Sequence, residues 1–245
     1  MMTLKSRRIL GLIAGMAMMG VAAPSLMAQA DAPRGKTPAA SQPEKDHKDK
    51  DAKPQKDARE SNKDGNGTVT IGQTAPAFEL KDTEGKTVKL SDFAGKVVVL
   101  EWFNPECPYV VKHHGEHKTM VNTYAKYKDK GVVWLAINSG APGKQGAGLE
   151  LNAQHKKDWK MEYPILLDES GKVGKAYGSK NTPTMFIIDA SGKLAYMGAI
   201  DNDNSAKKLG SINYVDQALG QILAKETVSS PVTKAYGCSV KYGGS

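Results

Sequence analysis

Two cysteines carry the covalent chemistry that this sequence offers, and they lie far apart in the chain. Cys107 stands between Glu106 and Pro108, directly after an apolar run and at the start of an expected helix. A thiol reacts as its thiolate, and the unpaired N–H groups of a helix N-terminus favour that anion. Pro108 suits the first helical position, where its missing N–H costs nothing. Cys107 is therefore the expected nucleophile, with Glu106 beside it as a candidate proton acceptor.

Cys238 is the expected redox partner of Cys107 and follows the last expected helix. An oxidised Cys107, or its mixed disulfide with a substrate, could be resolved by Cys238 to an intramolecular disulfide. The alternative is a permanent structural bridge, which would stabilise the fold by about 5 kcal/mol because it closes a long loop. The sequence leaves both roles open.

The elements that must position Cys107 alternate between strands and helices. Apolar runs at 96–103 and 132–137 predict strands that are buried on both faces of a sheet. Around them we expect two hairpins at 77–90 and 184–197, a short strand at 164–168, and helical segments at 108–130, 149–159, 172–177 and 214–224. Buried strands linked by helices pair in parallel, while the last hairpin adds antiparallel strands. The expected fold is therefore α/β, with a mixed central β-sheet and helices on both faces.

Three segments carry a resemblance to a known family. They are Ile71–Phe78 continued by Leu90–Lys96, then Glu106-Cys107-Pro108 at a strand-to-helix turn, then Asn181–Thr184 before a buried strand. In this order they resemble the redoxin family, which includes the alkyl hydroperoxide reductase/thiol-specific antioxidant (AhpC/TSA) proteins. The resemblance covers roughly residues 69–225 and implies a thioredoxin-like fold.

The resemblance also implies a role for the loop that contains Pro183. In thioredoxin-like folds, a cis-proline loop packs beside the reactive cysteine. Pro183 is therefore expected in the cis form next to Cys107. Thr182, Pro183 and Pro108 are the expected substrate-binding residues, with the backbone of Thr182 pairing with an extended substrate. A trans proline that only begins a strand is the alternative.

The sequence departs from both main branches of this resemblance. A Cys-x-x-Cys motif would need a second cysteine at position 110, which is Val110. A typical peroxiredoxin has Thr or Ser three residues before its cysteine, where this chain has Asn104. It also uses an arginine at the active site, and no arginine follows Arg59. These departures favour thiol-disulfide exchange over peroxide reduction.

Three histidines after Cys107 offer a metal-binding alternative. His113, His114 and His117 lie close to the cysteine in sequence, and exported copper chaperones with a thioredoxin fold use cysteines and a histidine in this region. The interpretation we favour is a solvent-facing helix surface rich in His, Lys and Glu. We therefore expect no metal and no cofactor.

The first 66 residues differ in composition from the rest of the chain. Residues 1–30 have a basic start, an apolar run and Ala28-Gln29-Ala30, which is the layout of a secretory signal peptide cleaved after Ala30. An uncleaved membrane anchor is the alternative. Residues 31–66 are charged and nearly free of apolar side chains, so they predict a disordered linker. A folded domain is expected at 67–228, with a tail at 229–245 that carries Cys238.

The net charge of +8 does not indicate nucleic acid as a partner, because the lysines are interspersed with acidic residues. We expect a periplasmic or secreted oxidoreductase that exchanges thiols and disulfides with proteins or small molecules. An external electron donor would restore it, and it would not stay inserted in a membrane. A thiol-dependent peroxidase using the same cysteine is the first alternative. A copper-handling protein and a non-catalytic domain with a structural disulfide are the others.

Overall fold

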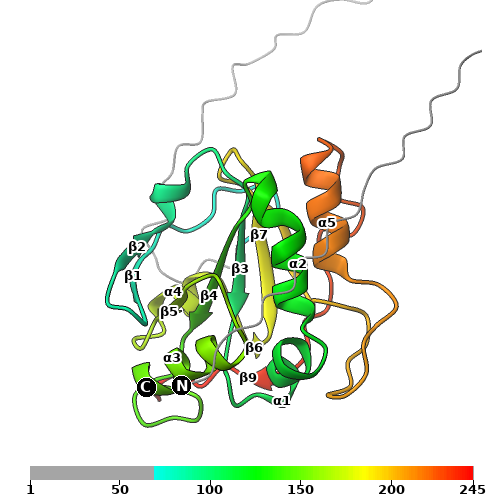
Figure 1. Ribbon diagram of the computed structural model, residues 1–245. Coiled ribbons are helices and arrows are strands. Elements are labelled where there is room, and N and C mark those ends of the chain that lie inside the picture. The colour runs from blue at the N-terminus through cyan, green and yellow to red at the C-terminus, as the bar shows by residue number, and fades with distance from the viewer. Residues whose placement is uncertain (1–68, 245) are drawn as a thin grey trace, which may run out of the picture. The chain divides into compact units, whose positions relative to one another are not determined.

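The structure is a computed structural model that describes residues 69–244, so the expected signal peptide and linker lie outside the described residues. A seven-stranded sheet runs through the domain in the order β2-β1-β5-β4-β3-β7-β8 (Figure 1). Its strands are β1 (Glu79–Asp82), β2 (Thr87–Lys89), β3 (Val98–Trp102), β4 (Val133–Asn138), β5 (Ile165–Leu167), β7 (Thr184–Ile188) and β8 (Leu194–Gly198).

The strands pair in parallel at the centre of the sheet and antiparallel toward both edges. β3 is parallel to β4 and β4 is parallel to β5, whereas β7 is antiparallel to β3 and β1 is antiparallel to β5. Parallel neighbours need crossover connections, which helices supply. α2 (Thr119–Tyr127) lies between β3 and β4 in the chain, and α3 (Leu149–Asp158) lies between β4 and β5. The mixed sheet that the sequence predicts is confirmed.

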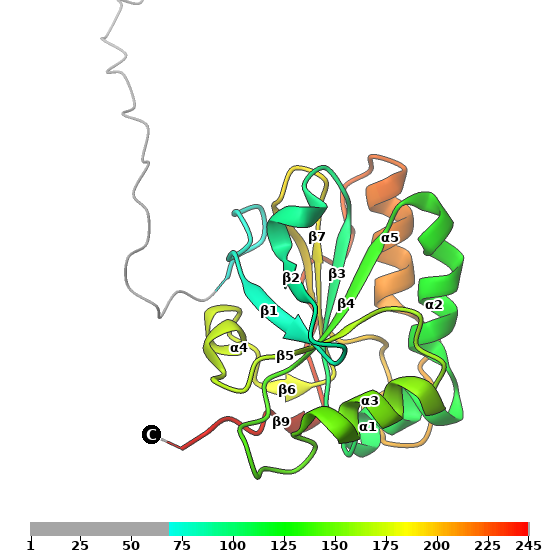
Figure 2. The same ribbon diagram turned by 60° about the vertical axis from the view of Figure 1, so that its left-hand side comes forward.

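Each face of the sheet has its own apolar core, because successive side chains of a strand point to opposite faces. Val99 belongs to the core under α2 and α5 (Tyr214–Leu223). Leu100 belongs to the opposite core, which includes Tyr177 at the end of α4 (Lys172–Ala176). Figure 2 shows α2 and α5 on one side of the sheet and α4 on the other. Helices on both faces are therefore confirmed.

The helix after Cys107 is less regular than the sequence predicts. The expected single helix at 108–130 is divided into α1 (Pro108–Val111), a π-helical turn (Lys112–Glu116), α2 and a 3₁₀ turn (Lys128–Lys130). Lys118 separates the π-helical turn from α2, because its left-handed backbone (φ 55°) does not continue a right-handed helix. A π-helical turn inside a helix often marks a functional site.

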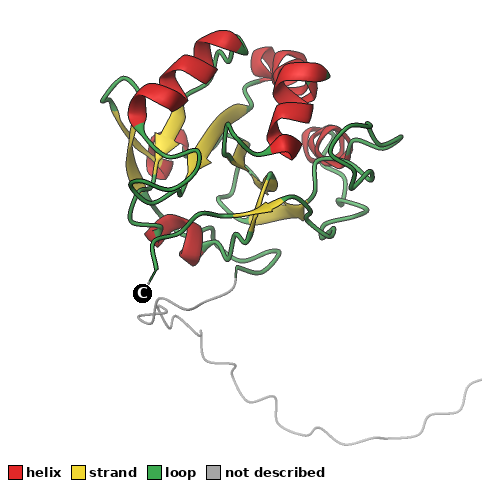
Figure 3. Ribbon diagram, turned by 90° about the horizontal axis from the view of Figure 1, so that it is seen from below, coloured by secondary structure: helices red, strands yellow, loops and turns green. Residues whose placement is uncertain are grey.

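The end of the chain packs against the domain. β9 (Cys238–Ser239) forms a short antiparallel pair with β6 (Asn181–Thr182), separate from the main sheet. Figure 3 views the domain from the end at which β6, β9 and α1 lie. Within residues 69–244 no helix is both long and apolar enough to cross a membrane.

Candidate active site

Cys107 lies just beyond the carboxyl end of β3, which pairs with β4 and β7 in the sheet, where the chain turns into α1. It caps that helix, and Pro108 is the first helical residue, as the sequence predicts. The backbone N–H groups of Val110 and Val111 both donate to the Cys107 carbonyl oxygen at 2.9 Å. The Cys107 side chain has no exposed surface (0%), so its thiol faces the interior of the domain.

The loop before β7 lies directly against the Cys107 thiol. Trp102 at the end of β3 pairs with Thr184 at the start of β7, and this register places the preceding loop beside the cysteine turn. The peptide bond between Thr182 and Pro183 is cis, as the resemblance implies. The Cys107 thiol donates to the carbonyl oxygen of Thr182 at 3.0 Å. The structure therefore brings together three residues that the sequence singles out.

Cys238 reaches the same place from the end of the chain. It lies in β9 directly opposite Thr182 of β6, and both cysteines are free thiols. Burial and, next in size, a hydrogen bond with Cys107 raise the pKa of Cys238 to about 11. At neutral pH Cys238 is therefore a protonated thiol held against Cys107.

Glu106 binds the glycine-rich loop at 140–148. Its carboxylate accepts a hydrogen bond from the Gly146 N–H at 2.6 Å, and the Asn104 side-chain amide donates to the Gln145 carbonyl oxygen at 3.2 Å. A Cβ atom at Gly146 would lie 2.0 Å from the Asn104 side chain, so this approach requires glycine. Glu106 and Asn104 therefore fix the loop beside the cysteine turn. A role for Glu106 as proton acceptor stays a prediction.

The expected solvent-facing surface after Cys107 is wrong, because Lys112 and His113 are fully buried. The Tyr236 hydroxyl donates to the Asp201 carboxylate, so the His113 Nε2–H must donate to that hydroxyl, at 2.9 Å. The Lys112 ammonium lies 3.7 Å from Asp201 Oδ2 and 5.2 Å from the centre of the Tyr236 ring. We call Lys112, His113, Asp201 and Tyr236 the Tyr236 cluster. It joins the helical segment after Cys107 to the residues just before Cys238.

His114 is buried in a second polar cluster, around Glu101 of β3. Its Nε2 lies 2.6 Å from Glu101 Oε1, and its ring stacks on Trp159. The indole N–H of Trp134 donates to the other Glu101 oxygen at 3.0 Å. Sequence reasoning missed this cluster, although one signal was present. Glu101 is a charged residue in an otherwise apolar strand, and a buried charge needs partners.

The histidines do not gather as the metal alternative requires. His113 and His114 bond to the two clusters just described, and His117 bonds to the carbonyl oxygen of Lys207 at 2.8 Å. In the part of the chain that the structure describes, no three His, Cys, Asp or Glu side chains are placed to hold a metal ion. Among the described residues, the three histidines after Cys107 therefore do not converge on one point.

Replacing His113 by glutamine is expected to reduce the sensitivity of the fold to acid. Burial lowers the pKa of His113 from its ordinary 6.5 to about 3. Between these values the unfolded chain binds a proton that the folded protein does not, so the free energy of unfolding falls as the pH falls. This one group contributes a slope of about 1.4 kcal/mol per pH unit. Urea unfolding of both proteins from pH 7 to 4 measures it, and parallel curves would contradict the prediction.

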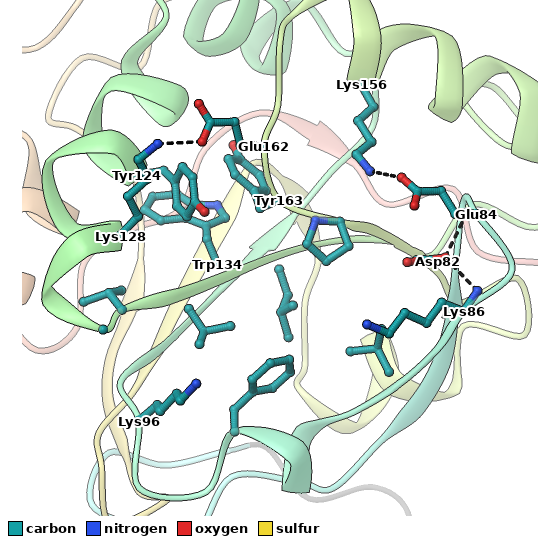
Figure 4. A pocket seen from close by; sticks show the side chains of 17 residues that line it. Asp82, Glu84, Lys86, Lys96, Tyr124, Lys128, Trp134, Lys156, Glu162 and Tyr163 are labelled. Carbon is teal, nitrogen blue, oxygen red and sulfur yellow. Dashed lines mark hydrogen bonds and ion pairs between the residues drawn. The ribbon is translucent and has the colours of Figure 1, made fainter.

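A groove of about 570 Å³ lies at the far end of β4 from the cysteines. It is bordered by the start of β4, whereas Cys107 follows the carboxyl end of the parallel strand β3. Two of its lysines are ion-paired, Lys128 with Glu162 and Lys156 with Glu84 (Figure 4). Neither cysteine borders this groove, so the two thiols lie in a different part of the domain.

The AhpC/TSA family matches residues 71–197, which is just over half of the chain and includes Cys107, Thr182 and Pro183. This chain belongs to the AhpC/TSA family. As a member of the family it is an oxidoreductase with a thioredoxin-like fold. Cys238 lies beyond the residues that the AhpC/TSA match covers.

The chain is also similar to proteins named thiol-disulfide oxidoreductase ResA. It is 35% identical to ResA of Bacillus thuringiensis subsp. konkukian over 129 residues, which cover 51% of this chain and 68% of that protein. It is 33% identical to ResA of Geobacillus thermodenitrificans over 147 residues, or 59% and 79% of the two chains. An uncharacterized conserved protein from Geobacillus kaustophilus has a similar structure, with a TM-score of 0.66 and 27% identity over 73% of this chain and 95% of that one.

Proposed function

We propose that this oxidoreductase performs thiol-disulfide exchange, with Cys107 as the attacking thiol and Cys238 as the resolving thiol. The observation that carries the proposal is the meeting of the two thiols. Cys238 lies opposite Thr182 and packs against the core that contains Cys107, whose own thiol donates to the Thr182 carbonyl oxygen. The reaction named for the ResA relatives supports the same class of chemistry.

The proposed reaction transfers two electrons from the protein to a disulfide. The Cys107 thiolate attacks one sulfur of the substrate, forms a mixed disulfide and releases the other substrate sulfur as a thiol. Cys238 then loses its proton and attacks Cys107, which forms the intramolecular disulfide and releases the second substrate thiol. An external dithiol donor reduces the Cys107–Cys238 disulfide and completes the cycle.

The residues around Cys107 support disulfide exchange over peroxide reduction. Asn104 takes the position of the peroxidatic Thr or Ser, and its amide holds the glycine-rich loop through Gln145. The chain after Arg59 contains no arginine to stabilise a bound peroxide. Substrates of the proposed enzyme are therefore thiols and disulfides of proteins or small molecules. We place the reaction outside the cytoplasm, in the periplasm or after secretion, because residues 1–30 have the layout of a signal peptide.

Replacing Cys238 by serine tests the proposed order of attack. The variant should stop at the mixed disulfide, because no second thiol is present to resolve it. Incubation with insulin followed by acid quenching and mass spectrometry should show one insulin chain bound at Cys107. Turnover of insulin disulfides with dithiothreitol as donor should fall well below that of the wild-type protein.

Two further measurements separate the alternatives. Wild-type protein that turns over hydrogen peroxide faster than insulin would overturn disulfide exchange as the main activity. A Cys238→Ser variant that turns over insulin at the wild-type rate would show that Cys238 does not resolve the intermediate. A Cys107→Ser variant is the control and should trap no insulin chain.

A further inference from the structure

The end of the chain is built into the loop that contacts Cys107 as an added strand. Cys238 and Ser239 pair with Thr182 and Asn181, and the Asn181 side-chain amide donates to the Gly237 carbonyl oxygen at 3.2 Å. The pairing continues one step further, where the N–H of Val240 donates to the carbonyl oxygen of Lys180 at 3.0 Å. The backbone edge of β6 is therefore fully used by this chain's own tail.

Gly237 makes the closest approach in this pairing. Its φ is +124°, and a Cβ atom there would lie 2.0 Å from the carbonyl oxygen of Thr182. Both observations exclude a side chain at this position unless the strand moves away. The surface of β6 therefore accepts a strand whose residue before the cysteine is glycine.

Two tyrosines hold the strand in place on either side of Cys238. Tyr236 is bound by the Tyr236 cluster described above. The Tyr242 hydroxyl donates to the carbonyl oxygen of Ser179 at 2.7 Å, and its ring lies against Gly171 and Gly174. With the strand docked, Cys107 has no exposed surface. In this arrangement the Cys107 thiol is closed to a polypeptide disulfide.

We propose that β9 occupies the substrate's place on the β6 edge in the resting protein, and that this edge selects extended polypeptides in which the disulfide-bonded cysteine follows glycine. The proposal rests on the proposed function and names its substrate class. Main-chain pairing gives such a strand affinity, and the contact at Thr182 gives it specificity. The segment Tyr236-Gly237-Cys238 is the pattern that the surface is shown to accept.

The same strand position then serves two steps of one cycle. The incoming peptide replaces β9, and the Cys107 thiolate attacks its sulfur, forms the mixed disulfide and releases the peptide's former disulfide partner as a thiol. Return of the tail brings the Cys238 thiolate to the Cys107 sulfur. This forms the intramolecular disulfide and releases the reduced peptide. Two electrons pass from the two protein thiols to the peptide disulfide, and an external dithiol restores them.

Two matched peptides test the specificity of the surface. The full-length Cys238→Ser protein is mixed with peptides that contain Tyr-Gly-Cys-Ser-Val or Tyr-Ala-Cys-Ser-Val, each as a disulfide with thionitrobenzoate. Release of thionitrobenzoate gives the rate of attack by Cys107. The glycine peptide should react about tenfold faster, which corresponds to about 1.4 kcal/mol, because alanine is strained at this positive φ and meets the Thr182 carbonyl oxygen. Equal rates would overturn the proposed surface.

A small disulfide that is not a peptide distinguishes an error in the proposed docking surface from an error in the proposed function. Cys107 should also react with the symmetric disulfide formed by two thionitrobenzoate molecules and release thionitrobenzoate. This reagent has no peptide backbone to pair with β6. Reaction with this reagent and equal peptide rates would refute the surface and leave Cys107 as the nucleophile. If Cys107 reacts with neither peptide nor with the symmetric disulfide, the proposed function itself is refuted.

Replacing Gly237 by alanine tests the role of the tail in the same chain. In the Cys238→Ser background this change should displace β9 and raise the rate of attack on the glycine peptide about tenfold. Gly244→Ala is the matched control, because a Cβ atom there meets nothing within 4 Å. An unchanged rate in Gly237→Ala would overturn the proposal that the tail occupies the substrate's place. If the Gly237→Ala variant folds poorly, the comparison of the glycine and alanine peptides in the Cys238→Ser protein still tests the specificity of the β6 edge.

Discussion

Replacing Cys107 by serine is expected to lower the rate of insulin disulfide reduction by about a thousandfold or more, as for other enzymes that lose their nucleophile. Serine preserves the size of the side chain and can still donate a hydrogen bond to the Thr182 carbonyl oxygen, where Cys107 now donates at 3.0 Å. Its hydroxyl is not ionised at neutral pH, however, and cannot form a disulfide. The measurement is the rate of insulin reduction with dithiothreitol as donor, together with a thermal unfolding curve to confirm the fold.

The Cys238→Ser variant is the matched control for this prediction, because it removes the other thiol and leaves Cys107 in place. That variant should still attack a disulfide once per molecule, whereas Cys107→Ser should not attack at all. Retention of wild-type turnover by Cys107→Ser would show that the nucleophile lies elsewhere. Single attack by Cys107→Ser, followed by a mixed disulfide at Cys238, would reverse the roles of the two thiols.

Replacing Glu101 by alanine is expected to lower the free energy of unfolding by about 3 kcal/mol or more, because each buried polar group left without its partner costs about 1–3 kcal/mol. Glu101 has no exposed surface and receives hydrogen bonds from two aromatic side chains, Trp134 at 3.0 Å and Tyr163 at 3.4 Å. Its other oxygen lies 2.6 Å from His114 Nε2. The alanine variant leaves these polar groups buried without a partner and creates a cavity behind the site. Urea unfolding at pH 7 measures the loss.

Glu79→Ala is the matched control, because it removes a carboxylate that has a partner but is exposed to solvent. Glu79 pairs with Lys89 at 2.9 Å on the surface of the β1–β2 hairpin, and more than half of its side chain is exposed. Surface ion pairs contribute at most about 1 kcal/mol, so this variant should unfold nearly as the wild type does. A Glu101→Ala protein as stable as Glu79→Ala would mean that the Glu101 cluster relaxes or admits water at little cost.

The order of the fold follows from local patterns that the sequence shows directly. The strand at Val98–Trp102 is buried on both faces and apolar except for Glu101, and the hairpin at 184–197 has its turn residues between two apolar runs. Such patterns depend on neighbours in the chain, so periodicity and turn residues are enough to predict them. The position of Cys107 at a helix start followed from Pro108 by the same local reasoning.

The environment of Lys112, His113 and His114 could not be predicted in this way. Three polar residues in succession on a helix indicate a solvated surface, yet all three are buried. Their partners Asp201 and Glu101 come from other parts of the chain, and the π-helical turn that holds them is not visible in residue types. Burial of charge depends on partners that only folding brings close.

The sequence by itself determined the mixed sheet, the helix that begins after Cys107, and the cysteine and proline loops from which the site is built. Only the tertiary structure decided where Cys238 lies. A tail after the last helix has no local pattern that fixes its path. Its place depends on the free backbone edge at Thr182 and on the distant groups that bind Tyr236 and Tyr242. These contacts join residues more than fifty positions apart, and they place the second thiol against the first.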